Sequence, residues 1–200
     1  MNHTTRNPDA GQSPERDEQL MVAFSRGSTE AFEVLFSRYK QPLFGFFTRR
    51  VADPAQAEEL TQEAFFAVLR SASRYAPRAL FRTYLYAIAF KILRTHRRKV
   101  ALRATLLGTA EHRGATLQRS FEAEVLLRQA VEKLERVDRE ILLLREFEQL
   151  SYAEIAELLR LPLNTVRSRL FRARMNLRDL LAAPAAKSSP SPLAEPEESL

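Results

Sequence analysis

The sequence predicts an all-α protein of two small helical domains joined by a flexible linker, with a helix-turn-helix in the C-terminal domain. Three observations lead to this fold class. The 200 residues include only five Gly and no Trp, and Leu, Ala, Glu and Arg are abundant, which favours helices. Apolar residues recur at helical spacing, and no segment alternates as a strand would. Near the C-terminus, two short helical segments flank a turn that contains Pro162.

Composition restricts the function classes. The net charge of +6 and the isoelectric point near 10.0 suit a polyanionic partner. The chain has no Cys, which excludes disulfides, thiolate metal sites and thiol catalysis. No apolar run approaches the roughly 18 residues typical of a membrane span, and the N-terminus lacks a signal-peptide core. We therefore expect a cytoplasmic protein that does not insert into membranes and carries neither a metal nor a cofactor.

The first helices are marked by caps and breakers. Residues 1–16 are polar and aperiodic, so they read as a tail. A helix is expected from about Asp17, and Gly27 can end it. Ser28 can cap a second helix, in which Pro42 is expected to cause a kink or a division.

The next helix should start at Asp53, a predicted N-cap, and run to about Arg70. Its core-facing residues follow the helical period: Ala57, Leu60, Ala64, Val68 and Leu69. Its outer face is acidic and polar and includes Glu59, Gln62 and Glu63. The helix macrodipole is a weak explanation for Gln62 and Glu63, because they lie beyond the first turn.

A strongly basic segment follows. Between Arg70 and Arg119 there are twelve Lys or Arg and a single acid, Glu111, a bias that indicates a nucleic-acid surface. Within it, Phe81 to Lys99 reads as a long amphipathic helix. Its expected buried stripe is Phe81, Leu85, Ile88, Ala89, Ile92 and Leu93. The candidate groups for single-stranded nucleic acid, which needs rings for stacking and cations for phosphates, are Tyr84, Tyr86, Lys91, Arg94, Arg97, Arg98 and Lys99. A core role stays open for some of the tyrosines.

The domain boundaries follow from these patterns. We expect an N-terminal domain at 17–100 and a linker at 101–120, where two Gly and scattered Thr interrupt the periodicity. A C-terminal domain should span 121–182, beginning with helices near 121–133 and 136–147. The Pro- and Ser-rich segment 183–200 should be a disordered tail.

The C-terminal motif begins with a capping box. Ser151 and Glu154 have the spacing at which each side chain can bond the other residue's backbone N–H, so a helix should start at Tyr152. Pro162 forbids its continuation, and Asn164 is expected to cap the following helix.

The second helix of the motif separates a buried stripe from a basic face. The stripe is Val166, Leu170, Ala173 and Leu177, at steps of four, three and four. The candidate DNA-contacting residues are Asn164, Thr165, Arg167, Ser168, Phe171 and Arg172. Arg can bond guanine edges or phosphates, although soluble helices often carry Arg on their wet face. Arg169 and Arg174 lie nearer the buried boundary and should contact phosphate or a carboxylate within the domain.

Three segments together resemble the extracytoplasmic-function sigma factors of bacterial RNA polymerase. The family's second conserved region is similar to the segment AEELTQEAFFAVL. The family's helix that melts the promoter and reads the minus-ten element is similar to FRTYLYAIA with the basic run after it. The family's fourth region, which reads the minus-thirty-five element, is similar to LSYAEIAELLRLPLNTVRSRLFRAR. The resemblance implies promoter DNA and core polymerase as partners, through the coiled coil of the largest subunit and the flap. It places Glu59, Gln62 and Glu63 on polymerase and leaves room for an anti-sigma factor.

The chain departs from the family pattern at four positions. Tyr84, Lys91 and Thr95 stand where the family usually has Trp, Asn and Asp, and Asn164 stands where Gly is frequent. These differences concern the details of strand opening and base preference, whereas the expected two-domain architecture is unaffected.

Two other classes of function remain as alternatives. A dimeric helix-turn-helix repressor or activator would need a dimerisation helix, which the pattern does not provide, and it would leave the acidic and basic helices unexplained. An enzyme is the weaker alternative, because His3, His96 and His112 have no ligand or triad spacing with nearby carboxylates.

Overall fold

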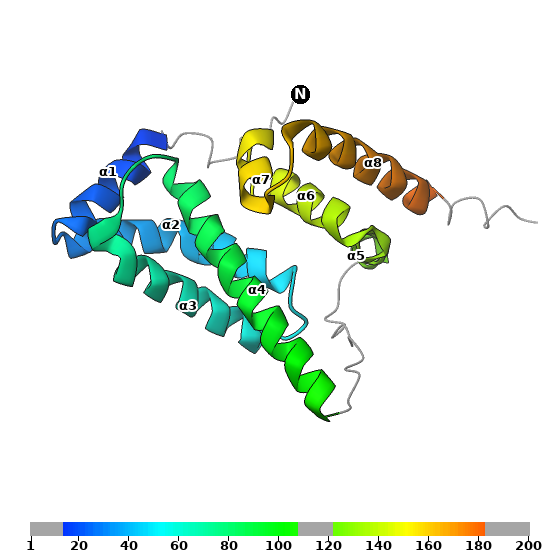
Figure 1. Ribbon diagram of the computed structural model, residues 1–200, viewed down its shortest axis with the longest axis horizontal. Coiled ribbons are helices and arrows are strands. Elements are labelled where there is room, and N and C mark those ends of the chain that lie inside the picture. Colours follow the sequence, from blue (N-terminus) through cyan, green and yellow to red (C-terminus); the bar gives the residue numbers. More distant parts are fainter. Residues whose placement is uncertain (1–13, 108–121, 183–200) are drawn as a thin grey trace, which may run out of the picture. The chain divides into compact units, whose positions relative to one another are not determined.

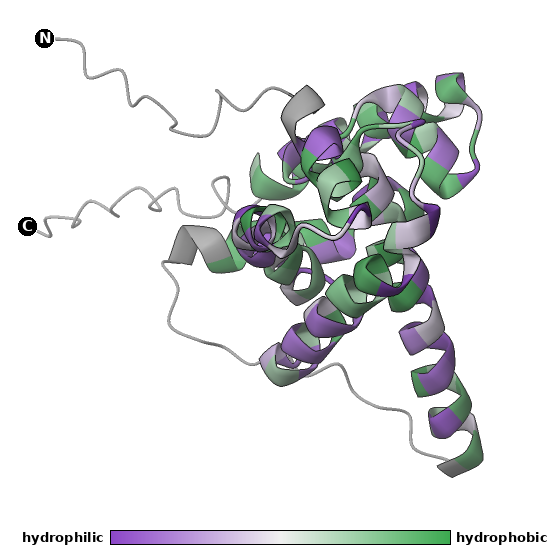
Figure 2. Ribbon diagram, turned by 90° about the vertical axis from the view of Figure 1, so that its left-hand side faces the viewer, coloured by the Kyte–Doolittle hydropathy of each residue, from purple (hydrophilic) through white to green (hydrophobic). Residues whose placement is uncertain are grey.

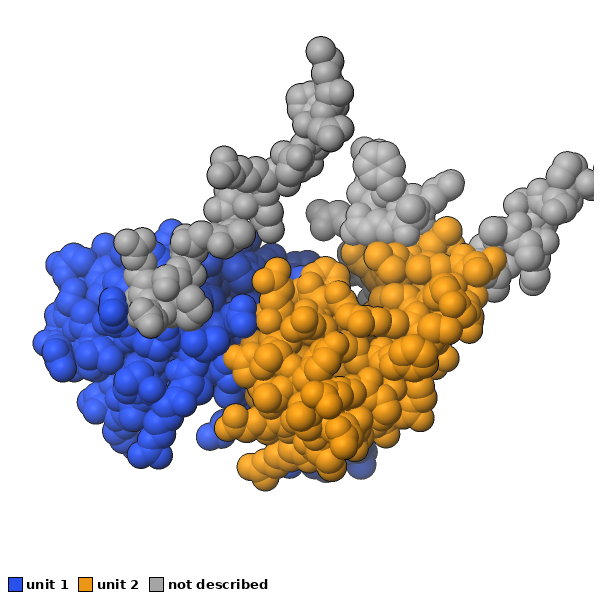
Figure 3. Space-filling model, turned by 90° about the horizontal axis from the view of Figure 1, so that it is seen from above, with its two compact units in different colours: residues 1–116 blue, residues 117–200 orange. Residues whose placement is uncertain are grey.

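The computed structural model describes residues 14–107 and 122–182. Helices are the only regular secondary structure in these two ranges, which confirms the predicted fold class. The chain divides into two compact units, residues 1–116 and 117–200 (Figure 3). The predicted tails at 1–16 and 183–200 lie largely outside the described residues, as does most of the linker.

Within residues 14–107, unit 1 contains four α-helices and one short 3₁₀ turn (Figure 1). They are α1 (Pro14–Ser25), α2 (Thr29–Thr48), α3 (Pro54–Ser71), η1 (Ala72–Arg74) and α4 (Phe81–Leu107). Helix α1 begins three residues before Asp17, its expected start. Helix α4 continues seven residues beyond position 100, so the linker cannot begin at 101 as predicted. The helix-favouring stretch ALRATLL explains the extension, because Ala, Leu and Arg are good helix formers.

The caps expected from the sequence are present in unit 1. Gly27 has φ +107°, a left-handed conformation that suits glycine between α1 and α2. The Ser28 hydroxyl accepts a hydrogen bond from the Ala31 N–H at 3.3 Å, and Asp53 accepts one from the Ala55 N–H at 3.0 Å. Helix α2 is not divided at Pro42, since the loss of one backbone bond is offset by buried residues on both sides of it.

The core of unit 1 is aromatic. Its largest fully buried side chains include Phe46, Phe47 and Phe81. The rings of Phe46 and Phe47 meet edge to face with centroids 5.1 Å apart. Helix α1 is tied to its neighbours by two acids: Asp17 accepts hydrogen bonds from Arg38 and Tyr39 on α2, and Glu18 accepts one from the N–H of Phe81, the first residue of α4. Helix α4 is therefore held at its N-terminus by α1.

Unit 2 contains α5 (Glu122–Lys133), α6 (Arg136–Glu146), α7 (Tyr152–Leu159) and α8 (Leu163–Ala182). Its core is aliphatic, and the fully buried side chains include Ile141, Leu144, Leu150 and Ile155. Helix α8 packs against the three other helices, most extensively against α6. Figure 2 shows hydrophobic and hydrophilic residues interspersed along the helices, as expected of amphipathic elements.

The helix-turn-helix agrees with the sequence except at one cap. Both bonds of the capping box form: the Ser151 N–H donates to Glu154 at 2.6 Å, and the Glu154 N–H donates to the Ser151 hydroxyl at 3.2 Å. Helix α7 ends at Leu159 and is followed by Arg160 in the left-handed conformation, φ 56°. The prediction that Asn164 caps α8 is wrong. The carbonyl of Pro162 already accepts a helical bond from Val166 N–H at 3.1 Å, so the helix begins at Leu163 and Asn164 lies inside its first turn.

Candidate nucleic-acid interface

Helix α8 presents two opposite faces. Its inner stripe is buried at three of the four predicted positions: Val166 and Ala173 are fully covered and Leu170 is 2% exposed, whereas Leu177 is only partly buried. Successive residues in a helix are rotated by about 100°, so positions between these lie on the outer side. Four of them are exposed, namely Arg167, Ser168, Phe171 and Arg172. The structure therefore brings together the central part of the predicted upstream-reading set on one solvent face.

Phe171 is the most unusual member of this face. It is 65% exposed, although the exposure of a phenylalanine ring to water is unfavourable in free energy. The side chain is flanked by Arg167 and Arg172, whose charges point to an anionic surface. An exposed apolar ring on the same helix face as two arginines has the chemistry needed to pack on a thymine methyl or a sugar while the cations reach phosphates and bases.

The two remaining members lie in the first turn of α8. Asn164 is exposed, and Thr165 is partly buried. The Thr165 carbonyl accepts a hydrogen bond from the Ser168 hydroxyl at 3.1 Å. That hydroxyl can rotate away from the helix to meet a ligand, because the carbonyl it bonds also belongs to the helical ladder.

Arg169 and Arg174 contact carboxylates within unit 2, which was one of the two outcomes expected for them. One guanidinium nitrogen of Arg169, Nη1, donates to Glu135 at 2.7 Å and to Asp138 at 2.8 Å. Arg174 donates to Glu146 at 2.7 Å and 3.2 Å. Both pairs connect α8 to α6 or to the cap before α6. These two arginines are thereby distinguished from Arg167 and Arg172.

Helix α4 carries the basic surface of unit 1. Its apolar side is buried at Phe81, Leu85, Ala89, Ile92 and Leu93, whereas Ile88 is only partly buried. Four predicted nucleic-acid contacts are exposed, namely Lys91, Arg94, Arg98 and Lys99, and Arg97 is partly buried. Lys91, Arg94 and Arg98 follow steps of three and four, so they share one face of the helix.

The tyrosines of α4 differ from expectation. Tyr86 is 3% exposed and packs on Phe46 with ring centroids 5.5 Å apart, so its assignment as a stacking platform is wrong. Tyr84 is partly buried, and its hydroxyl is 2.6 Å from the Ser71 hydroxyl. Sequence spacing could have identified Tyr86 as a core residue, because it precedes Ala89 by three positions and Leu93 by seven.

His96 lies within the basic part of α4. Burial lowers its pKa, and the charges of Lys99 and Arg97 lower it further, while the carboxylate of Glu63 on α3 acts in the opposite direction. The side chain is therefore neutral at neutral pH, since even an unperturbed His titrates near 6.5.

The outer face of α3 is exposed as predicted at Glu59, Gln62 and Glu63. It also contains an apolar group that the sequence reading omitted. Phe66 is 56% exposed and lies three residues after Glu63, whereas its neighbour Phe65 is buried. Leu69, expected in the core, is 37% exposed on the same side. The adjacent pair Phe65 and Phe66 was a signal that one ring could face outward, because successive residues of a helix are rotated by about 100°.

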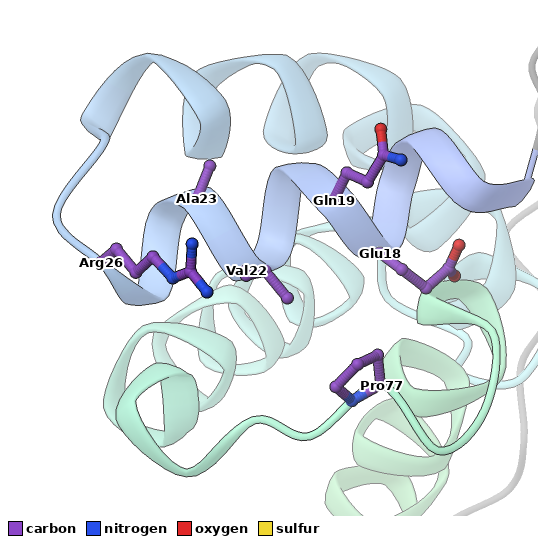
Figure 4. A pocket seen from close by; sticks show the side chains of 6 residues that line it. All are labelled: Glu18, Gln19, Val22, Ala23, Arg26 and Pro77. Carbon is purple, nitrogen blue, oxygen red and sulfur yellow. The ribbon is translucent and has the colours of Figure 1, made fainter.

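Other site types have little support among the described residues. No group of three or more His, Cys, Asp or Glu there could hold a metal ion, and no helix there is long and apolar enough to cross a membrane. A pocket of about 360 Å³ lies beside α1 and the segment before α4 (Figure 4). It is lined by Glu18, Gln19, Val22, Ala23, Arg26 and Pro77. The Glu18 carboxylate already bonds the start of α4, so this pocket is built around a structural contact.

Comparison with known families matches both units. Residues 35–103 match the family model described as Sigma-70 region 2, and residues 124–177 match the one described as Sigma-70, region 4. These ranges include the exposed faces of α3 and α4 in unit 1 and that of α8 in unit 2.

Relatives of similar length match along most of the chain. The RNA polymerase sigma-H factor of Pseudomonas aeruginosa is 33% identical over 175 residues, which cover 80% of this chain and 91% of the relative. The ECF RNA polymerase sigma-E factor of Escherichia coli is 30% identical over 173 residues, covering 79% and 90%. Together, the fold, the exposed faces and the relatives define the class of protein, which is a promoter-recognition subunit of RNA polymerase. The chain belongs to the extracytoplasmic-function group of the sigma-70 family of RNA polymerase sigma factors.

Two solved structures share the fold. CnrH, solved in complex with the cytosolic domain of CnrY, is 25% identical with a TM-score of 0.65, covering 84% of this chain and 98% of that one. RpoE from Bartonella quintana, solved with the anti-sigma factor NepR, has a TM-score of 0.69 at 18% identity, covering 77% and 98%. The second likeness concerns the fold alone. Sigma factors are non-catalytic specificity subunits of the polymerase they serve.

Proposed function

We propose that this sigma factor uses unit 2 to read the minus-thirty-five element, and unit 1 both to read and melt the minus-ten region and to dock on core RNA polymerase. The proposal rests above all on α8, where the burial of Val166, Leu170 and Ala173 leaves an exposed face of two arginines, a serine and a phenylalanine. An exposed aromatic ring beside positive charges is unfavourable in water and is typical of a surface that binds a partner.

The roles on α8 follow from side-chain chemistry. Arg167 and Arg172 can each make bidentate bonds to guanine edges or pair with phosphates. Ser168 can bond a base edge or a phosphate, and Phe171 can pack against a thymine methyl. Asn164 and Thr165, in the first turn, are placed to meet the backbone where the helix enters the major groove.

On α4, the exposed cationic side chains bind the phosphates of the separated DNA strand. Lys91, Arg94, Arg98 and Lys99 supply the charge, and Arg97 adds to it from a partly buried position. Of the two tyrosines of α4, Tyr84 is partly exposed and Tyr86 is buried, so we assign stacking on an unpaired base to Tyr84.

On α3, Glu59, Gln62 and Glu63 form the proposed contact with the coiled coil of the largest polymerase subunit. Phe66 extends this surface with an apolar anchor, 56% exposed, one turn further along the helix. Interfaces commonly combine a buried aromatic with a polar rim, and the combination on α3 fits that description. Unit 2 would meet the polymerase flap.

Three further assignments complete the proposal. The chain has no catalytic site of its own and acts in the cytoplasm, where core polymerase and DNA are found. An anti-sigma factor is its proposed regulator. This last assignment is supported by the family resemblance and by the likeness to CnrH, which was solved with the cytosolic domain of a second protein.

A footprinting experiment tests the division of labour. Holoenzyme is reconstituted from core polymerase and the full chain, then bound to a promoter selected by the wild-type protein. Arg167→Ala should reduce upstream protection, whereas Arg94→Ala with Arg98→Ala should reduce permanganate reactivity of melted thymines while upstream protection persists. If both variants reduced the two signals equally, the separate roles assigned to the units would be wrong.

A further inference from the structure

Arg169 occupies a distinctive place on α8. It lies between Ser168, on the exposed face, and Leu170, in the core. Its Nη1 atom donates simultaneously to Glu135 at 2.7 Å and Asp138 at 2.8 Å. Both acceptors lie at the start of α6, so one side chain at the edge of the DNA-facing surface is anchored to a neighbouring helix.

The acceptors are themselves fixed in place. Glu135 caps α6 by accepting from the N–H groups of Val137 at 3.2 Å and Asp138 at 3.4 Å. Its pKa is lowered, first by the bond from the Val137 N–H and further by those from Asp138 and Arg169. The Asp138 side chain is 7% exposed, so its charge depends on Arg169 for compensation. The anchor is therefore rigid on the α6 side.

The second ion pair between the same helices has a different character. Arg174 and Glu146 leave 50% and 46% of their side chains exposed. Exposed pairs of this kind contribute little, because water and salt screen them. Arg174 lies five residues after Arg169 on α8, and among the described residues its carboxylate partner is Glu146. Replacing Arg174 therefore provides a matched control for replacing Arg169.

Rotation of α8 about its axis matters for base reading. Side-chain atoms lie about 5–6 Å from a helix axis, so a rotation of about 10° moves a groove-facing atom by about 1 Å. Bidentate bonds to base edges lose their geometry over such a displacement, whereas a phosphate contact tolerates it. Arg167 and Phe171 each lie two residues from Arg169, and Arg172 lies three residues away. A fixed Arg169 thus restricts the orientation of the whole exposed face.

We propose that Arg169 is a positioning residue for upstream recognition, which sets the rotation of α8 through Glu135 and Asp138 and thereby its sequence selectivity. The proposal rests on the proposed function, since it requires that α8 reads the upstream element. It assigns Arg169 no contact with DNA. Neutralising Asp138, the buried one of its two carboxylate partners, should therefore lower selectivity in the same direction as replacing the arginine itself.

The test uses holoenzyme made with the full chain and a promoter library whose upstream element is randomised. Selectivity is the ratio of binding to the preferred upstream sequences over the average of the library. The variants are Arg169→Met, Asp138→Asn, the double variant, and Arg174→Met as control. The double variant leaves no unpaired buried charge, so it reports on selectivity even if Arg169→Met folds poorly. Thermal unfolding identifies variants that are simply unstable.

Arg169→Met should lower selectivity about tenfold, the scale of one misplaced bidentate contact, and Asp138→Asn should lower it in the same direction by no more than that. The double variant should lose no more than Arg169→Met alone, because Arg169→Met already removes both of the bonds that Arg169 makes to Glu135 and Asp138. Arg174→Met should keep the wild-type ratio. The slope of binding against salt should stay at the wild-type value, since no phosphate contact is removed.

Three results would overturn the proposal. Uniform weakening at Arg169→Met with a salt slope lower by about one would make Arg169 a phosphate contact. Equal losses at Arg169→Met and Arg174→Met would reduce both to general helix packing. Additive losses in the double variant would separate Arg169 from Asp138. Failure of the proposed function would look different, because wild-type holoenzyme would then show no upstream selectivity at all.

Discussion

Phe171 and Leu170 are adjacent in α8, yet truncating Leu170 should mainly lower stability, whereas truncating Phe171 should mainly lower DNA affinity. Leu170 is 2% exposed, so Leu170→Ala leaves a cavity in unit 2 and should cost about 2–5 kcal/mol of folding free energy. Phe171 is 65% exposed, so about a third of its burial free energy is realised in the free protein. With about 1.5–3 kcal/mol for complete burial, Phe171→Ala should cost only about 0.5–1 kcal/mol of stability.

The remaining two thirds of the burial free energy of the Phe171 ring is gained when α8 enters the major groove of the DNA. It corresponds to about 1–2 kcal/mol, or roughly 5- to 30-fold in affinity for promoters with the upstream element. Amide exchange across α6 and α8 measures the stability, and holoenzyme binding to promoters with and without that element measures the affinity. Equal destabilisation by both variants, or undiminished upstream-dependent binding by Phe171→Ala, would refute the assignment of the two faces.

Four further outcomes are expected. Glu63→Lys should weaken binding to core polymerase by about fivefold or more, close to 1 kcal/mol, in a titration that also shows unchanged helicity by circular dichroism. Arg94→Ala combined with Arg98→Ala should lower the salt slope of open-complex formation by about 1.4, and an unchanged slope would remove both from the phosphate track. Tyr86→Ala should destabilise unit 1 by about 3–5 kcal/mol in urea unfolding, whereas Tyr86→Phe should keep wild-type permanganate reactivity. Because folding lowers the pKa of Glu135, the ionised Glu135 carboxylate stabilises the folded protein fully above its ordinary pKa of about 4.3. This stabilisation is lost as the pH falls through the lowered pKa. The melting temperatures of Glu135→Gln and the wild type should therefore differ at pH 7 and converge in acid.

Local chemistry allowed much of the helical framework to be predicted from the sequence. Ser28, Asp53 and Ser151 all cap the helices that follow them, because a side-chain oxygen at an N-cap satisfies a specific backbone N–H. The buried stripe of α8 was predictable for a similar reason, since a strict helical period leaves one solution for Val166 and Leu170. Such features depend on residues a few positions apart.

The differences arise where residues far apart in the sequence decide the outcome. The spacing of Tyr86 to Ala89 and Leu93 is compatible with a core position, but its ring partner, Phe46 of α2, is a contact that the pattern of α4 alone does not reveal. Phe66 is exposed because the rings of Phe32 and Phe36 meet its neighbour Phe65 instead. The partners of Arg169 were predictable as a class, a carboxylate or a phosphate, while their identity depends on how α6 packs on α8.

Transcription from a genomic promoter library by core polymerase, with and without the full-length protein, tests the central claim most directly. The account predicts run-off transcripts that start at a restricted set of promoters only when the protein is present. It also predicts that Phe171→Ala reduces initiation at those promoters while the protein remains folded and bound to core polymerase. Transcripts that are the same with and without the protein would contradict its role as a promoter-specificity subunit.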